Sequence, residues 1–361
     1  MKIAVFHNYM DNIGGAERVG LTLAREFKAD FYSTNINHEA IKKLGFSNIN
    51  MKSIGKVPIN PPLKQQVSLI RFRYFKPKKE YDYYIIDGDW AMSGSVKNKP
   101  NLWYVHSPIR EIWDLYEYTR KNNVPWFGRP IFDLWVKYNR YLNRKYIKHV
   151  DKIACNSINT QNRIKKYLKR EAVVINPPIE TEHFHYKKTG DYWLSVNRLI
   201  THKRVDLQMK AFAKMPEEKL IVVGCYEKSR HFQAYSNYIK RIKPNNVVLL
   251  KSAPFDELVA LYANCKGFIT TSHDEDFGMT PVEAMASGKP VIAPNEGGYK
   301  ETVIDGETGV LIDDINVDKL VDAVKKVGKN PESYKVACLK QAKKFDTKVF
   351  IEKIKEQIGT I

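Results

Sequence analysis

Short apolar runs alternate with longer amphipathic stretches along most of the chain. In the first half, the pattern predicts strands at residues 2–6, 83–86, 102–105, 153–155 and 173–175 and helices at about 15–27 and 130–149. In the second half, it predicts strands at 193–197, 220–223, 247–250, 267–271, 291–293 and 310–312. Helices are expected between and after them, at about 205–214, 229–241, 256–264, 281–287, 317–327, 331–344 and 347–358. This alternation predicts two doubly wound parallel sheets, each a Rossmann-like α/β domain.

The boundary between the two domains is expected at the breaker cluster Asn176-Pro177-Pro178, after which the strand–helix pattern restarts. A chain of 361 residues also exceeds what one hydrophobic core usually organises. We therefore expect an N-terminal domain at residues 1–178, a C-terminal domain at 179–345 and a terminal helical segment at 346–361.

The polar pattern at residues 274–293, D-E-D-F-G-M-T-P-V-E-A-M-A-S-G-K-P-V-I-A, predicts the start of a helix. Thr280 is expected as the N-cap and Pro281 as the first helical residue. Glu283 would then stand at the third helical position and complete a capping box. A capping box by itself fits a purely structural helix start equally well.

The same window also has the features of a ligand site. A glycine loop at Gly278 that leads into a helix directs several backbone N–H groups at one point, which suits an anion. Glu275 and Glu283 flank that point, and carboxylates accept hydrogen bonds from hydroxyl groups. A ligand that combines phosphate with many hydroxyls is a nucleotide sugar.

The window resembles the Glu-x7-Glu signature of retaining glycosyltransferases of family 4, which have the GT-B fold: two Rossmann-like domains that face a central cleft. The resemblance implies that Glu275 contacts the donor sugar and that Glu283 holds the ribose hydroxyls. It also implies that the backbone between them touches the sugar and phosphates, at Phe277, Gly278, Met279 and Thr280. The terminal segment would pack back onto the N-terminal domain.

Other segments extend the resemblance over nearly the whole chain. In V-N-R-L-I-T-H-K-R-V-D, Arg198 and Lys203 are similar to the family's cation pair, which grips the donor's phosphates without a metal. Gly14-Gly15 resembles the glycine loop near the donor, and His106 the histidine near the reacting sugar. Each of these features alone also fits a structural role. The resemblance places the base pocket at Gly224 and Ala253 and the acceptor side at Arg110 and Trp113.

The sequence H-S-P-I-R-E-I-W-D, which begins at His106, is most similar to that of the mannosyltransferase branch that uses GDP-mannose. The family's mechanism implies a front-face route in which the leaving phosphate accepts the acceptor's proton. Two departures make the base pocket less certain: G-C-Y-E follows the strand at 220–223 where G-x-G is usual, and Cys155 stands where alanine is commoner.

No metal or other cofactor is expected. Asp87-Gly88-Asp89 has the D-x-D spacing of metal-dependent glycosyltransferases of another fold, but we interpret it as a loop. Four cysteines show no zinc spacing and are expected to be buried thiols: Cys155, Cys225, Cys265 and Cys338. No apolar run reaches membrane-span length and the N-terminal run is too short for a signal peptide, so a cytoplasmic protein is expected.

Positive charge is concentrated in the first half. Residues 1–178 contain 31 Lys and Arg against 15 Asp and Glu, whereas residues 179–361 contain 28 against 25. Basic residues interleave with aromatic ones at 64–79 and 129–148, which suits an anionic membrane surface or nucleic acid, although a solvated lysine-rich face has the same composition. In a glycosyltransferase, this basic half could hold an anionic acceptor, such as a lipid-linked phosphate glycan, or make peripheral contact with an anionic membrane.

The function that these features favour is transfer of a hexose, mannose or a related sugar, from a GDP-sugar to a hydroxyl of a glycan or lipid-linked glycan. A UDP-sugar donor is the first alternative. A non-catalytic sugar-nucleotide sensor and a nucleic-acid-binding protein remain open, although no nucleic-acid readout module is recognisable. An oxidoreductase would require G-x-G-x-x-G after the first strand, where the chain has only Gly14-Gly15.

Overall fold

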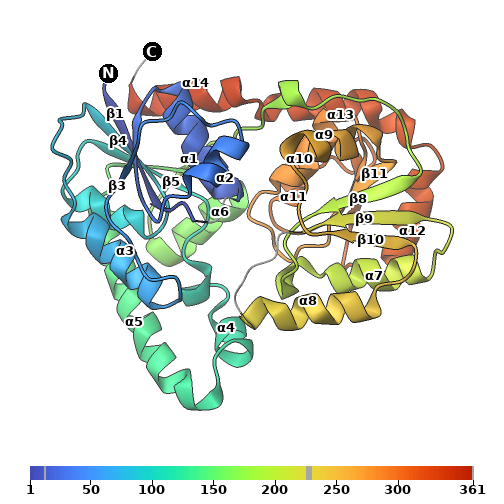
Figure 1. The fold of residues 1–361 in the computed structure, drawn as a ribbon, viewed down its shortest axis with the longest axis horizontal. Helices are drawn as coiled ribbons and strands as arrows, with labels where there is room; N and C mark the ends of the chain where they lie inside the picture. The colour runs from blue at the N-terminus through green and yellow to red at the C-terminus, as the bar shows by residue number, and fades with distance from the viewer. Residues whose placement is uncertain (12–13, 225–229, 360–361) are drawn as a thin grey trace. The chain divides into compact units, whose positions relative to one another are not determined.

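A computed structural model describes residues 1–11, 14–224 and 230–359, which form two α/β units (Figure 1). The N-terminal unit contains Met1–Pro178 and the C-terminal segment from Phe350 onward. The C-terminal unit contains Ile179–Val349. Each unit is built on one parallel sheet with helices on both faces, so the predicted pair of doubly wound domains is confirmed.

The sheet of the N-terminal unit has the strand order β3-β2-β1-β4-β5-β6-β7. Its strands are β1 (Ile3–Tyr9), β2 (Asp30–Thr34), β3 (Met51–Ser53), β4 (Tyr83–Asp87), β5 (Asn101–Val105), β6 (Lys152–Cys155) and β7 (Val173–Val174). In register, Val5 of β1 lies between Phe31 of β2 and Ile85 of β4. All of the pairings are parallel, as expected where helical crossovers connect the strands.

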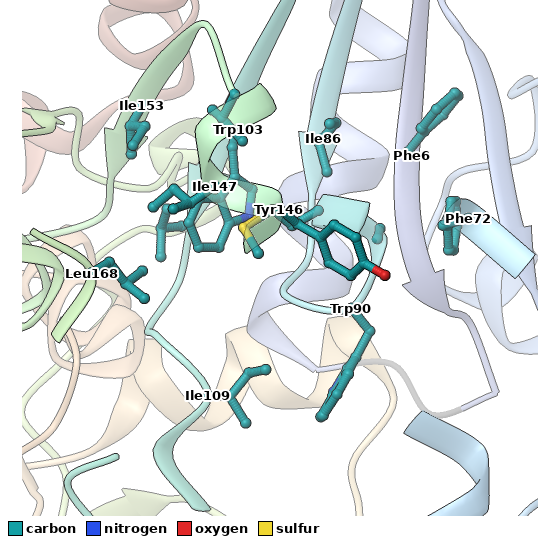
Figure 2. Close-up of a cluster of buried hydrophobic side chains, with 14 of the residues drawn as sticks. Phe6, Phe72, Ile86, Trp90, Trp103, Ile109, Tyr146, Ile147, Ile153 and Leu168 are labelled. Atoms are coloured by element: carbon teal, nitrogen blue, oxygen red, sulfur yellow. The ribbon is translucent and has the colours of Figure 1, made fainter. Parts of the chain in front are cut away.

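The helices of this unit are α1 (Gly15–Glu26), α2 (His38–Lys43), α3 (Leu63–Tyr74), α4 (Tyr116–Asn122), α5 (Arg129–Tyr146), α6 (Ile158–Arg163) and most of α14 (Thr347–Ile358). Figure 2 shows the core on one face of the sheet, where strand residues such as Phe6, Ile86 and Trp103 gather with Phe72 of α3 and Tyr146 of α5. The terminal helix α14 belongs here because the ring of Phe350 meets the edge of Tyr104 in β5, with 5.5 Å between ring centroids.

The sheet of the C-terminal unit has the order β10-β9-β8-β11-β12-β13. Its strands are β8 (Tyr192–Val196), β9 (Lys219–Val223), β10 (Val247–Leu250), β11 (Gly267–Ile269), β12 (Val291–Pro294) and β13 (Gly309–Ile312). Its helices are α7 (Val205–Ala213), α8 (Arg230–Ile242), α9 (Phe255–Asn264), α10 (Met279–Ala286), α11 (Tyr299–Thr302), α12 (Val317–Gly328) and α13 (Lys335–Ala342).

Alternate residues of this second sheet enter two separate cores. Leu194 and Phe268 pack with α9 and α10, whereas their neighbours Trp193 and Ile269 pack with α7 and α12. Successive side chains of a strand point to opposite faces, so both faces of the sheet are buried. This explains why the strands read as continuous apolar runs in the sequence.

In both sheets the first strand lies beside the fourth strand of the unit: β1 beside β4, and β8 beside β11. The chain leaves these neighbouring strands toward opposite sides, and ligands of open α/β sheets bind at the carboxyl ends of the strands at such a switch point. Among the helices that the structure describes, none combines the length and the apolar composition needed to cross a bilayer.

Candidate functional site

The loop from β11 to α10 carries Glu275 at the switch point of the C-terminal sheet. Its carboxylate accepts hydrogen bonds from the Lys203 ammonium at 2.5 Å and from the Tyr299 hydroxyl at 3.4 Å. Burial, the largest single effect, would raise the pKa of Glu275, but the charge and hydrogen bond of Lys203, together with Ser272 and His202, lower that pKa to about 2. The carboxylate is therefore ionised at neutral pH and can only accept hydrogen bonds.

Lys203 reaches Glu275 because the loop after β8 is held in place by its neighbour, Arg204. The Arg204 guanidinium donates to the carbonyl oxygen of Thr271 at 2.7 Å and to Glu296 at 2.9 Å. Glu296 in turn accepts from the backbone N–H of Asp274 at 3.1 Å. Arg204 and Glu296 thus tie three loops together at the carboxyl ends of β8, β11 and β12.

Sequence reasoning missed Arg204 and Glu296 as supports of the site. Arg204 directly follows Lys203 in the motif V-N-R-L-I-T-H-K-R-V-D, so the sequence contained a signal for it. For Glu296 the sequence contained no such signal, because its role depends on contacts with the neighbouring loops. Arg198 was predicted correctly to follow β8 and is exposed there. Together the loops bring Arg198, Lys203 and Glu275 to the same edge of the sheet.

The predicted start of α10 is wrong by two residues. The helix begins at Met279, and its N-cap is Gly278 in the left-handed region, with φ at 92°, instead of Thr280. Only glycine adopts this conformation readily. The loop therefore ends at Gly278, two residues before the N-cap that the capping-box pattern predicts. Pro281 is then the third helical residue, where its missing N–H removes no intrahelical hydrogen bond.

Glu283 consequently forms no capping box. Its side chain turns inward, where it is 4% exposed and accepts a hydrogen bond from the Tyr262 hydroxyl at 2.8 Å. Capping would have left this carboxylate at the solvated helix end. A buried carboxyl group needs hydrogen-bond partners, because an unsatisfied polar group in the interior costs free energy, and the Tyr262 hydroxyl supplies one.

Of the residues predicted to touch the donor, Phe277 contributes no exposed side chain. Its ring is buried and meets the ring of Phe345 edge-on, with 5.4 Å between centroids. Met279 likewise packs partly against the core. Gly224 directly follows β9, and a Cβ there would lie 2.9 Å from the carbonyl oxygen of Asn197. Ala253 is partly buried and packs against the core that contains Leu194 of β8.

Gly298, which follows β12, packs closely against the loop that carries Glu275. Gly298 donates its N–H to the carbonyl oxygen of Glu275 at 2.8 Å, and a Cβ at Gly298 would lie 2.4 Å from the Cα of Phe277. Both atoms are backbone, so neither can move without moving the loop.

Gly298→Ala is therefore expected to push the Glu275 loop away from β12. We expect the free energy of unfolding to fall by about 1–3 kcal/mol, the usual cost of overpacking. The measurement is urea unfolding followed by tryptophan fluorescence. Gly328→Ala is the matched control, since its Cβ would have only ordinary contact, 3.6 Å from the Trp193 ring. Equal stability of the two variants would contradict the close packing of this loop.

In the N-terminal unit, Gly14-Gly15 opens α1 as predicted, with Gly14 as the N-cap. The backbone N–H of Gly14 donates to the Glu17 carboxylate at 2.8 Å. That carboxylate also approaches the ring of His7, with 3.7 Å between Glu17 Oε1 and His7 Nε2. The glycine loop is therefore connected to β1 through an acid and a histidine.

The expectation that Asp87 lies in a loop is wrong. Asp87 is the last residue of β4, is fully buried, and bridges two histidines: His106 Nε2 at 2.6 Å and His7 Nδ1 at 2.8 Å. The close approach of α1 requires glycine at position 20, because a Cβ there would lie 2.4 Å from Asp87. The buried relay, Glu17–His7–Asp87–His106, thus spans the switch point of this sheet.

The charges of the buried relay stabilise one another. Burial opposes ionisation of each group, but Asp87 and Glu17 together raise the pKa of His7 to about 10. The carboxylate of Asp87 also raises the pKa of His106, and the histidines lower the pKa of Asp87. An ionised Asp87 accepts two hydrogen bonds, so the ring nitrogens of His7 and His106 that face it carry hydrogen. His106 is thereby oriented by Asp87.

The two residues predicted for the acceptor side are engaged within the unit. Arg110 pairs with Asp114 at 2.8 Å. Trp113 is 7% exposed and its ring stacks on Tyr167, with 5.2 Å between centroids. Trp113 is thus a core residue, and acceptor contact by its side chain would require rearrangement.

Among the described residues, no group of three or more His, Cys, Asp or Glu side chains is arranged to hold a metal ion. Cys155, Cys265 and Cys338 are buried thiols, as predicted. Burial raises the pKa of Cys265 to about 12. Cys225 lies outside the described residues.

The relatives of the chain agree with this architecture. Residues 178–345 match the family model described as glycosyl transferases group 1. An uncharacterized glycosyltransferase of Methanocaldococcus jannaschii is 30% identical over 194 residues, 54% of either chain. The alpha-1,3/1,6-mannosyltransferase ALG2 of Dictyostelium discoideum is 29% identical over 238 residues, 60% of this chain and 56% of the relative. The chain thus spans little more than half the length of these relatives.

Among solved structures, Anabaena HepE in complex with UDP and glucose superposes with a TM-score of 0.78, over 100% of both chains at 17% identity. At this identity the likeness concerns the fold alone, and it confirms the expected GT-B class. Family model, relatives and fold all agree with the resemblance of the Glu-x7-Glu window to that of the family 4 glycosyltransferases.

Proposed function

We propose that the protein is a retaining glycosyltransferase that moves a hexose from a nucleoside diphosphate to a hydroxyl of a glycan or lipid-linked glycan. The observation that carries the proposal is the hydrogen bond between Lys203 and Glu275. An ammonium group can bind a phosphate, and a carboxylate can bind sugar hydroxyls. Because Lys203 and Glu275 are in direct contact, the phosphate and the hydroxyls that they would bind must also be adjacent. A sugar phosphate presents its charges and hydroxyls in that way.

In the proposed reaction, the bond from the anomeric carbon to the diphosphate oxygen breaks, and a bond from that carbon to the acceptor oxygen forms. The acceptor's proton passes to the departing phosphate. Lys203 and Arg198, with the N–H groups at the start of α10, would stabilise the charge that develops on the diphosphate. Glu275 would orient the sugar and Glu283 the ribose, while His106 would serve the acceptor side. No metal is required in this scheme.

For the sugar, we infer mannose carried by GDP. This inference is supported by the motif H-S-P-I-R-E-I-W-D and by the sequence similarity to ALG2, an alpha-1,3/1,6-mannosyltransferase. A UDP-sugar is the alternative, and its support is the fold shared with HepE, whose structure is in complex with UDP and glucose.

A thermal-shift panel with GDP, UDP, ADP and their sugars separates these donors. A ligand at 100 times its dissociation constant adds about 2.7 kcal/mol to the apparent stability, so the true donor is expected to raise Tm by several degrees. We expect GDP and GDP-mannose to give the largest shifts. A larger shift with UDP and its sugars would move the assignment to the alternative, and no shift with any nucleotide would contradict the proposed function.

Two further assays separate the remaining classes. Donor binding without hydrolysis or transfer would indicate a sugar-nucleotide sensor. A gel shift with nucleic acid at physiological salt would indicate a nucleic-acid-binding protein, since such binding depends on phosphate contacts that salt weakens.

A further inference from the structure

Helix α5 of the N-terminal unit has one face that is committed to the core. The residues of this face recur every three or four positions: Phe132, Trp135, Val136, Asn139, Leu142, Asn143 and Tyr146. Phe132 stacks on Tyr116 of α4, with ring centroids 6.0 Å apart and planes 11° apart. Phe132 and Trp135, two of the aromatic residues in the basic segment 129–148, are thus engaged inside the unit.

Another side of α5, next to the core face, and the turn before the helix expose large apolar side chains. These are Trp126, Phe127, Ile131, Leu134, Tyr138 and Tyr141, which we call the α5 stripe; their exposed fractions run from 55% to 78%. From Phe127 onward they recur at spacings of four and three residues, so they line one side of the helix. Single exposed apolar residues are ordinary, whereas a contiguous row marks an interaction surface.

The α5 stripe belongs to a helix that projects from the sheet of its unit, with its N-terminal end beside α4 (Figure 1). The stripe covers 16 residues, or about 24 Å of helix, which is shorter than the roughly 30 Å core of a bilayer. A helix of this kind lies along a surface and does not cross it.

The charges beside the α5 stripe are positive. Lys137, Lys145 and Lys148 are exposed, and the Lys145 ammonium lies 5.8 Å from the centre of the Tyr141 ring. Asp133 is the one acidic residue in the sequence of α5, and its carboxylate is bound by Arg120 at 2.8 Å. The face therefore combines interfacial aromatic residues with lysines whose charge has no acidic counterpart on the helix.

We propose that the α5 stripe docks on the surface of an anionic lipid bilayer. Its aromatic and aliphatic side chains enter the boundary between headgroups and acyl chains, and the flanking lysines contact the anionic headgroups. A second copy of the chain is a poorer partner, because a two-fold contact would set this basic face against itself with no acidic residue to complement it. The inference is independent of the sugar and the nucleotide.

The test is flotation of the full chain with vesicles of phosphatidylcholine alone or mixed with phosphatidylglycerol. We expect binding to the anionic vesicles to exceed binding to neutral ones by about tenfold or more, and to fall as salt screens the lysines. Leu134→Glu should reduce binding about tenfold or more, and Lys137→Gln about fivefold. The matched controls are Val336→Glu, at an equally exposed apolar residue of α13, and Lys326→Gln in α12; both should bind like the parent.

Trp126 supplies a readout that reports on the surface itself. Its indole is 78% exposed, so its fluorescence should shift to the blue when anionic vesicles are added. Trp126→Phe should lose that shift and still float with the vesicles. Parent-level binding by Leu134→Glu would overturn the proposal. So would a dimer in sedimentation velocity that Leu134→Glu dissociates, since the stripe would then be the contact between two copies.

Discussion

Glu275→Gln is expected to lower kcat/KM for glycosyl transfer by about 100-fold or more. The amide keeps the size of the side chain but can no longer accept two hydrogen bonds with full negative charge, so the donor sugar loses its fixed orientation. The Lys203 ammonium would at the same time lose the carboxylate that it contacts at 2.5 Å. Initial rates over a range of donor concentrations separate the loss of kcat from a change in KM.

The C-terminal unit offers a closely matched control for this variant. Glu218 accepts hydrogen bonds from Lys266 at 2.7 Å and from the Trp193 indole, and its exposed fraction of 18% is close to the 19% of Glu275. Glu218→Gln should therefore cost similar stability and leave transfer near the parent rate. If both variants keep parent activity, Glu275 has no role in transfer. If both lose activity equally, the effect is structural.

Asp87→Asn is expected to cost the N-terminal unit about 3–5 kcal/mol, because it removes the buried carboxylate that hydrogen-bonds the imidazoles of His7 and His106. In the parent, His7 binds its proton more tightly in the folded state than in the unfolded state. Its contribution is complete below its ordinary pKa of 6.5 and declines as pH rises toward about 10. Asp87 contributes above its ordinary pKa of 3.8 and loses that contribution as pH falls. The deficit of the variant should thus be largest between about pH 4 and 6.5.

Urea unfolding at about pH 5.5 and pH 9 checks this sign, with a smaller difference between parent and variant expected at the higher pH. Asp133→Asn is the control, because its ion pair with Arg120 is about one-third exposed and such pairs contribute little to stability. A deficit that is the same at both pH values would show that Asp87 acts by packing and not by charge. Loss of activity in excess of the loss of folded protein would point to the orientation of His106.

The regular elements of the fold could be predicted well where side-chain burial follows local periodicity. The six strands of the second sheet and the last helix, Thr347–Ile358, were all expected from the pattern. β2 and β3 were missed because their sequences, D-F-Y-S-T and M-K-S, mix polar and apolar residues. Their polar groups are satisfied by distant partners, such as Asp30 by Asn50 and Lys52. Local hydrophobicity contains no information about such partners.

The positions of the candidate site residues could be predicted where a motif encodes the geometry of the backbone. They could not be predicted where they depend on the direction in which a side chain points. Arg198, Lys203 and Glu275 lie at the carboxyl ends of adjacent strands, as the motifs indicate. Glu283 was expected at a helix cap and is instead held inside by Tyr262. The capping-box pattern could not reveal this, because Gly278 takes a left-handed conformation that shifts the helix start.

The sequence by itself determined the fold class and the features on which the proposed function rests: two doubly wound units joined after Pro178, a basic N-terminal half, and a Glu-x7-Glu window that resembles that of glycosyltransferases. These features are encoded within a few residues of one another. Only the tertiary structure decided that Asp87 joins His7 to His106, that Arg204 and Glu296 support the Glu275 loop, and which residues of α5 face outward. Such contacts join side chains up to 90 or so positions apart, and their geometry exists only once the packing of strands and helices has fixed where each side chain points.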